Sequence, residues 1–205
     1  MQEIFAHTAL TPAGWRGNVR LTIGDDGRIS AVTPDADTGD AMEVPVLLPA
    51  VSNLHSHTFQ RAFAGLAERR SAEGHDSFWT WREVMYRFLD QLQPEDIRAI
   101  AAFAFMEMQE AGFCAVAEFH YLHHQPGGEP YADIGELSSR TVEAAEETGI
   151  GLTLLPVFYR YGGADQRPLK SGQLRFGNDL DSFARLAEKA GDHLSHLPTD
   201  AVLGL

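Results

Sequence analysis

The distribution of apolar residues divides the chain into a strand-rich start and a longer part in which helices and strands alternate. Within residues 1–45, apolar residues alternate with polar ones at Val19, Leu21 and Ile23, and residues 24–27 form a turn signal. A period of two is typical of half-buried strands. We therefore predict a small β subdomain over residues 1–45.

From residue 46 onward, continuous apolar runs alternate with segments of helical spacing. The predicted elements are, in chain order, a strand over 46–51 leading to His55, a helix over 94–111, a strand over 113–119, a helix over 134–148, a strand over 150–157, a helix over 179–190 that ends at Gly191, and the start of a strand over 201–205. This alternation predicts an α/β fold with a parallel sheet and helices outside it. A full eight-stranded barrel needs about 250 residues, so four strands make either half a barrel or a smaller open sheet.

Two histidines separated by one residue, His55 and His57, follow the first apolar strand of this part. Residues i and i+2 of an extended chain point to the same side, so both imidazoles can converge on one point. The carboxyl end of a buried parallel strand is also where barrel enzymes carry their chemistry. The pair is therefore a candidate for the first two ligands of a divalent metal in a hydrolytic site, with ordinary surface histidines as the alternative.

The next apolar strand ends in a second polar run, residues 118–124. The carboxyl ends of parallel strands open on one face, so we expect this run near the histidine pair. His120 and Tyr121 are nearest the strand end, and lining a pocket and a structural position are equally favoured for them. For His123 and His124 we predict solvated loop positions.

Two further segments are candidates for function. The insert over residues 75–83 places Arg82 among aromatic residues that we predict to form a packed cap, namely Phe78, Trp79 and Trp81. A guanidinium beside indoles is suited to bidentate capture of a carboxylate, although an ion pair with Glu83 or Asp90 is an equal alternative. The loop over 159–178 is long and rich in glycine, which often marks a functional loop.

Composition narrows the class of protein. The chain has 205 residues, of which 44% are hydrophobic and 22% charged, as in globular proteins. A net charge of −13 argues against a nucleic-acid partner and favours a small-molecule substrate. Residues 1–7 lack the features of a signal peptide, and no run approaches the ~20 apolar residues of a membrane span, so we expect a cytoplasmic protein without a membrane partner. The single Cys114 is predicted to be a small buried core residue.

Three runs of sequence together resemble formimidoylglutamate deiminase, a member of the amidohydrolase superfamily. They are LPAVSNLHSHTFQRA at residues 48–62, SFWTWR at 77–82 and EFHYLHH at 118–124. The histidine pair after a strand is shared by the whole superfamily, whereas the second and third runs are much more specific. The likeness extends over the entire chain.

The resemblance implies a metal-dependent (β/α)8 TIM barrel preceded by a small β-sandwich, with residues 1–45 in the sandwich and 46–205 forming the first half of the barrel. The implied reaction is hydrolysis of N-formimino-L-glutamate to N-formyl-L-glutamate and ammonia in histidine breakdown, with one zinc ion, and we expect the full-length form to be a homodimer. By the same resemblance, the zinc ligands would be His55 and His57, and the substrate contacts would be Gln60, Arg82 and Tyr121.

The resemblance also implies that the site is incomplete here. The family takes a further metal histidine, a catalytic glutamate and a second essential histidine from the fifth and sixth barrel strands, and a metal aspartate from the eighth. It takes a substrate-binding histidine and arginine from a segment after a strand like the one at 201–205. We expect all of these beyond residue 205, with no catalytic residue in this chain. A catalytic zinc normally has three protein ligands, so we expect the polypeptide alone to be inactive.

Two other functions remain open from the sequence. The histidine pair and zinc are common to the superfamily, so another aminohydrolase acting on a purine-like or amidine substrate is one alternative. The other is a non-catalytic half-barrel that self-associates, because an open parallel sheet leaves an exposed edge strand. Imidazole ligands also suit iron, copper and nickel, so the pair does not fix the metal.

Overall fold

The computed structural model describes residues 1–66 and 78–205, and its description of side chains resumes at residue 80. The side chains of Phe78 and Trp79 lie outside the described part, and so does the aromatic cap predicted from them. The described chain divides into two compact units, Met1–Ala50 and Val51–Leu205. Each unit is built around a sheet of its own.

The smaller unit is a four-stranded mixed sheet. Its strands are β1 (Gln2–Thr11), β2 (Gly14–Ile23), β3 (Ile29–Thr33) and β4 (Met42–Leu47), in the order β3-β2-β1-β4. β1 pairs antiparallel with β2 and parallel with β4. Small apolar side chains, Ala6, Ala9 and Val19, form its buried core. The strands predicted from alternation in this part of the sequence are confirmed.

The larger unit is an α/β fold on a parallel sheet. Its strands are β5 (Val51–Ser56), β6 (Phe113–His120), β7 (Gly151–Pro156) and β8 (Val202–Leu203), and they lie in sequence order. Every neighbouring pair is parallel. The predicted parallel sheet of four strands is therefore confirmed.

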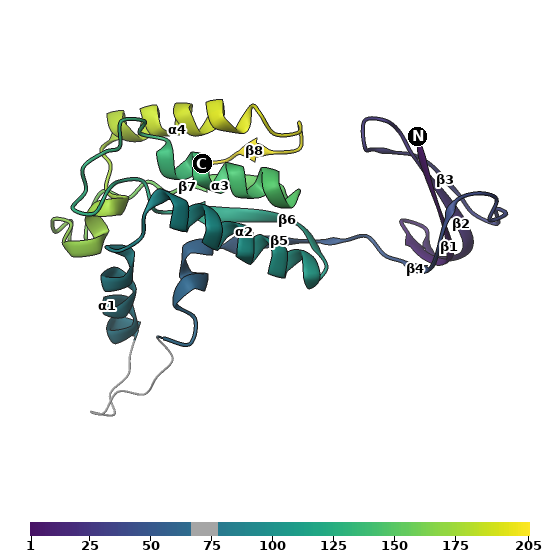
Figure 1. The fold of residues 1–205 in the computed structure, drawn as a ribbon, viewed down its shortest axis with the longest axis horizontal. Helices are drawn as coiled ribbons and strands as arrows, with labels where there is room; N and C mark the ends of the chain where they lie inside the picture. Colours follow the sequence, from purple (N-terminus) through teal and green to yellow (C-terminus); the bar gives the residue numbers. More distant parts are fainter. Residues whose placement is uncertain (67–77) are drawn as a thin grey trace. The chain divides into compact units, whose positions relative to one another are not determined.

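Helices connect these strands, as Figure 1 shows. They are α1 (Phe78–Leu89), α2 (Pro94–Glu110), α3 (Glu136–Thr148) and α4 (Leu180–Leu194), with 3-10 helices η1 (Thr58–Phe63) and η2 (Ser171–Phe176) in the connections. Buried residues of α2, α3 and α4 pack with those of β6 and β7 in one hydrophobic cluster. None of the described helices has the length and apolarity needed to cross a membrane.

Local sequence signals account for the helix ends that were predicted correctly. Helix α2 begins with Pro94 at its first turn and a capping box between Gln93 and Asp96. Helix α3 ends at Gly149, whose φ of 74° is the left-handed conformation that glycine adopts without a side-chain clash.

Two predicted boundaries are wrong. The helix expected to end at Gly191 continues through it to Leu194, which is 6% exposed and packs in the main cluster, so tertiary burial outweighs the helix cost of a glycine. The apolar segment 46–51 is not one strand. Leu47 pairs in the first sheet and Val51 in the second, and the residues between them, including Pro49, are in neither.

Two other expectations need correction. Residues 78–89 form helix α1, where the sequence indicated only an aromatic insert. Cys114 is exposed rather than buried, because it lies at the amino end of β6 and the buried core on that face begins only at Val116. The position of a residue along a strand, and not its type, decides its burial here.

Candidate metal centre

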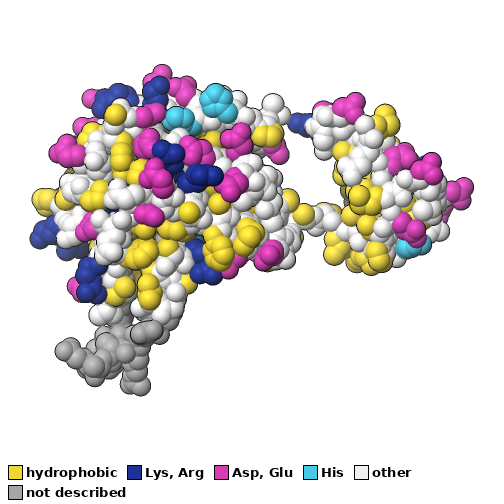
Figure 2. All heavy atoms as spheres, in the orientation of Figure 1, with side chains coloured by type: hydrophobic (Ala, Val, Ile, Leu, Met, Phe, Trp, Pro, Cys, Tyr) yellow, Lys and Arg dark blue, Asp and Glu magenta, His cyan; other side chains and the backbone are white. Residues whose placement is uncertain are grey.

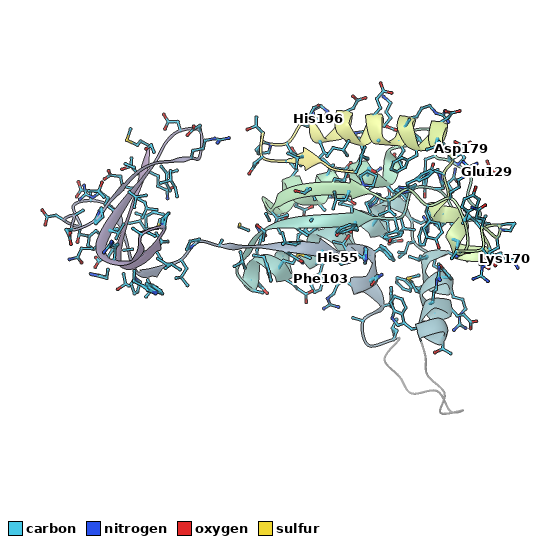
Figure 3. All side chains as sticks on the ribbon, turned by 180° about the vertical axis from the view of Figure 1, so that it is seen from behind. His55, Phe103, Glu129, Lys170, Asp179 and His196 are labelled. Carbon is cyan, nitrogen blue, oxygen red and sulfur yellow. The ribbon has the colours of Figure 1, made fainter. Side chains whose placement is uncertain are left out.

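The histidine pair lies at the carboxyl end of β5, on the edge of the sheet where α1 and η2 also lie (Figures 1 and 3). His55 is the penultimate residue of the strand, and His57 directly follows the strand. Their Nε2 atoms are 3.2 Å apart. The predicted convergence of the two imidazoles is therefore confirmed.

A hydrogen bond at the other ring nitrogen, Nδ1, fixes the orientation of the His57 imidazole. Its Nδ1 lies 3.0 Å from the backbone carbonyl oxygen of Phe119. A carbonyl only accepts, so Nδ1 is the donor in this bond and Nε2 is the nitrogen that faces His55. A hydrogen bond of this kind on the distal nitrogen is the usual support of a metal-ligating histidine.

The separation of the two nitrogens fits a zinc ion. Two ligands at ~2.0–2.1 Å from a tetrahedral zinc lie about 3.3–3.4 Å apart, close to the observed 3.2 Å between the Nε2 atoms. In the described ranges 1–66 and 78–205, no group of three or more His, Cys, Asp or Glu side chains is placed to hold a metal. The pair alone could supply only two ligands, and a metal site here would need at least one more.

A cavity of about 410 Å³ adjoins the pair. Four of the residues singled out from the sequence line it: His57, Gln60, Arg82 and Tyr121. They come from the loop after β5, from α1 and from the loop after β6. The remaining lining residues are mostly aromatic or apolar: Phe59, Trp81, Met85, Tyr86, Tyr159 and Phe176. The structure therefore brings the separate sequence runs together around one apolar space with few polar groups, as small-molecule sites usually are.

Arg82 is held by two phenols. Its Nε donates to the Tyr86 hydroxyl at 2.6 Å, and its Nη2 donates to the Tyr159 hydroxyl at 2.9 Å. Burial alone would lower the pKa of this guanidinium, but the two phenols outweigh burial and raise it. Arg82 is thus a fixed cation in the cavity wall, oriented by residues that the sequence did not point to.

Glu118 is a buried acid beneath the pair. It is fully buried, and one carboxylate oxygen accepts from the Thr58 backbone N–H at 2.8 Å and from the Thr58 hydroxyl at 2.9 Å. Burial raises the pKa of Glu118, while the bonds from Thr58 lower it in part. Through these bonds the carboxylate joins β6 to the chain segment that carries His57, so it supports the geometry of the pair.

His123 and His124 are buried rather than solvated, which corrects the prediction. They are 0% and 4% exposed. Their backbone N–H groups donate to the Arg175 carbonyl at 2.9 and 3.0 Å, and the Arg175 guanidinium donates back to the His124 carbonyl. The long loop after β7 therefore covers the loop after β6, a contact across about 50 positions that local sequence does not reveal. His120 is also buried, so of the two strand-end residues only Tyr121 lines the cavity.

Most of the residues missed by sequence reasoning share one signal, their place in the long loop after β7. Tyr86, Tyr159, Gln173 and Phe176 surround Arg82 and Tyr121, and three of them belong to the long glycine-rich loop or its 3-10 helix. That loop was singled out as functional by its length. Which of its side chains turn toward the cavity depends on tertiary contacts, such as the bridge between Tyr159 and Gly177.

Comparison with solved structures defines the class of protein to which this fold belongs. A structure described as an amidohydrolase from Brucella melitensis is 44% identical to this chain, has a TM-score of 0.94, and is matched over 100% of this chain and 45% of its own length. Atrazine chlorohydrolase TrzN from Arthrobacter aurescens TC1, solved with zinc, has a TM-score of 0.72 at 18% identity, over 100% of this chain and 46% of that one. The fold is that of the amidohydrolases.

The particular resemblance is to formimidoylglutamate deiminase. Residues 1–43 match the family model described as "Formimidoylglutamate deiminase HutF, N-terminal domain". The chain is 49% identical over 190 residues to formimidoylglutamate deiminase from Pseudomonas aeruginosa, a match that covers 92% of this chain and 42% of that relative. The resemblance recognised from the three sequence runs is confirmed, and the chain spans less than half the length of this relative.

Proposed function

We propose that this chain is part of a zinc-dependent deiminase that hydrolyses N-formimino-L-glutamate to N-formyl-L-glutamate and ammonia. The observation that carries the proposal is the cavity in which His57, Gln60, Arg82 and Tyr121 meet, beside the Nε2 atoms of the histidine pair. The 49% identical relative bears the name of this activity. The homodimer expected for the full-length form and the substrate contacts of Gln60 and Tyr121 are part of the same proposal.

The residues around the cavity have two roles in the proposed reaction, namely metal binding and substrate binding. When bound, zinc supplies a Lewis acid that makes water a nucleophile near neutral pH. His55 and His57 would hold the zinc, and the Phe119 carbonyl accepts from His57 Nδ1 so that Nε2 is the nitrogen that would face it. In the same cavity, Arg82 binds a substrate carboxylate through its planar guanidinium. The other lining residues are mostly aromatic or apolar, so the cavity offers few competing polar groups.

The same proposal extends to the architecture. The four parallel strands β5–β8, with their connecting helices, would form the first half of a (β/α)8 barrel, and the mixed sheet of Met1–Ala50 would be part of a β-sandwich. The histidine pair and the cavity-lining residues lie near the carboxyl ends of strands or on α1, and this end is where such barrels carry their chemistry. Further ligands and the catalytic acid–base groups would come from outside the described residues.

The assay that tests the proposal measures ammonia release by the longest natural form of the protein. Formiminoglutamate should be turned over, and adenine and guanine should not, because only the former offers a carboxylate to Arg82. Turnover of a purine with none of formiminoglutamate would replace the proposal by a different aminohydrolase. Absence of turnover with every substrate, in a protein that holds its metal, would also contradict it.

A further inference from the structure

Arg82 and Tyr86 line a second cavity as well as the first. This second cavity has a volume of about 360 Å³, and its remaining lining comes from Glu83 and from the long loop after β7 with the start of η2: Gly162, Arg167, Pro168, Lys170, Ser171 and Gln173. The two cavities share Arg82 and Tyr86 and no other described residue. We call the cavity beside the histidine pair the inner cavity and the second one the outer cavity. Arg82 therefore lies between the two.

The partition between the two cavities is a chain of hydrogen bonds. Gln173 donates to the Tyr159 hydroxyl at 3.1 Å, Arg82 donates to the same hydroxyl at 2.9 Å, and Arg82 also donates to Tyr86 at 2.6 Å. Gln173 lines only the outer cavity and Tyr159 only the inner one. A ligand that reaches Arg82 from the outer side thus meets the same guanidinium that faces the inner cavity.

The outer cavity is cationic in an acidic protein. Its charged lining consists of Arg82, Arg167 and Lys170 against a single acid, Glu83. Arg167 also pairs with Asp165 at 3.4 Å, whereas no ion pair of Lys170 is found within the described ranges. The whole chain carries a net charge of −13, and Figure 2 shows acidic side chains spread over both units. A local excess of positive charge in such a protein attracts anions to one place.

The loop that carries these cations is anchored. The Gln173 side chain is 8% exposed, donates to the Gly162 carbonyl at 3.3 Å and accepts from the Lys170 backbone N–H at 3.1 Å. Gly162 packs so closely that a Cβ there would lie 2.6 Å from the Pro168 carbonyl oxygen. The backbone at Lys170, labelled in Figure 3, is therefore held beside Gln173. The backbone that carries these cations therefore has a defined position, and the charged ends of Arg167 and Lys170 reach into the outer cavity from it.

We propose that the outer cavity is an entry vestibule for dicarboxylate substrates, in which Lys170 and Arg167 concentrate the anion and pass it to Arg82. The inference rests on the proposed function, because N-formimino-L-glutamate carries two carboxylates and can engage two cationic groups at once. Lys170 and Arg167 act on capture of the substrate and do not touch the reacting atoms.

The test neutralises one vestibule charge at a time. In the longest natural form of the protein, Lys170→Gln and Arg167→Gln should each lower kcat/KM for formiminoglutamate about threefold to tenfold at low ionic strength, with kcat unchanged. The deficit should vanish near ~0.5 M salt, where the Debye length falls to a few Å. Lys189→Gln removes the same charge from α4, away from both cavities, and should leave kcat/KM unchanged. A deficit that persists at high salt, or a fall in kcat, would overturn the vestibule.

A binding measurement separates this inference from the proposed function. Glutarate is a dicarboxylate without a formimino group, and calorimetry at low salt should show weaker binding to Lys170→Gln than to the parent protein. Equal affinities, or no glutarate binding by the parent, would overturn the vestibule whatever the ammonia assay gives. If glutarate binds more weakly to Lys170→Gln but the parent protein does not hydrolyse formiminoglutamate, the vestibule proposal is supported and the proposed deiminase activity is refuted.

Discussion

At the scale of single residues, the two ring nitrogens of His57 make different contacts. Nδ1 donates to the Phe119 carbonyl, which leaves Nε2 as the nitrogen that faces His55. Because Phe119 belongs to β6, the neighbouring strand orients the imidazole that directly follows β5. The proposed metal binding at the pair would therefore depend on the pairing of two strands and not only on two histidines.

Replacing Arg82 by lysine keeps the positive charge but should still impair substrate binding. Arg82→Lys removes the planar fork that bonds Tyr86 and Tyr159 and that can bind a carboxylate with two parallel hydrogen bonds. We expect KM for formiminoglutamate to rise about tenfold to a hundredfold, corresponding to about 1.4–2.7 kcal/mol, with a smaller change in kcat. Steady-state kinetics checks this. Arg87→Lys on the same helix is the matched control, and an equal effect of both variants would contradict the assigned role.

Sequence alone identified residues of the site that have a local signature. The spacing of His55 and His57 sufficed to predict that they converge, and a guanidinium beside indoles pointed to Arg82. Tyr159 could not be found this way, because it meets Arg82 across 77 positions. His123 and His124 were misplaced for the same reason, since the cover over them comes from Arg175 and its loop.

At the scale of elements, one glycine at the end of α3 and one inside α4 should change stability in opposite directions when each is replaced by alanine. Gly149 follows α3 with φ of 74°, and no atom lies within 4 Å of the point that a Cβ would occupy, so Gly149→Ala should lower stability by about 1 kcal/mol through backbone strain alone. Gly191 lies inside α4, and a Cβ there would make an ordinary 3.7 Å contact with Leu203. Gly191→Ala should raise stability by about 0.5–1 kcal/mol.

Urea unfolding of the two variants beside the parent protein measures both effects. Changes of equal sign would show that backbone conformation does not dominate at these positions. The pair also illustrates what the sequence could predict of the elements. Glycine correctly marked the end of α3, but the same residue type in α4 did not end the helix, because Leu194 is buried one turn later.

At the scale of the whole molecule, buried neutral histidines make the fold sensitive to acid. Burial lowers the pKa of His120 to about 4, and it also lowers the pKa values of His123 and His124. An unfolded histidine titrates near ~6.5, so between these values the unfolded chain binds more protons than the folded one. The contribution of these histidines to the free energy of unfolding is complete above pH ~6.5. It is lost as the pH falls toward about 4.

His120 alone should account for about 3 kcal/mol of this loss. Glu118 acts in the opposite direction, since burial raises its pKa and the folded state then gains relative stability as the pH falls. Urea unfolding at about pH 7.5 and about pH 5 should show a clear loss of stability at the lower pH, and a smaller loss in His120→Gln. A pH dependence identical in the variant and the parent would refute a neutral buried His120.

The parallel order β5-β6-β7-β8 was predictable from apolar runs that alternate with helices. The break between the two units at residue 50 was not, because Val46 to Val51 reads as one apolar run while its two ends pair in different sheets. Hydrophobicity predicts that a segment is a strand, and only pairing decides which sheet it joins.

The most direct test of the whole account is the metal content of the longest natural form of the protein. Elemental analysis should find about one zinc per chain in the parent, which His55→Ala and His57→Ala should each lose. His196→Ala removes an exposed imidazole from the segment after α4 and should keep the metal (Figure 3). Full zinc content in both His55→Ala and His57→Ala would contradict the metal centre and the function built on it.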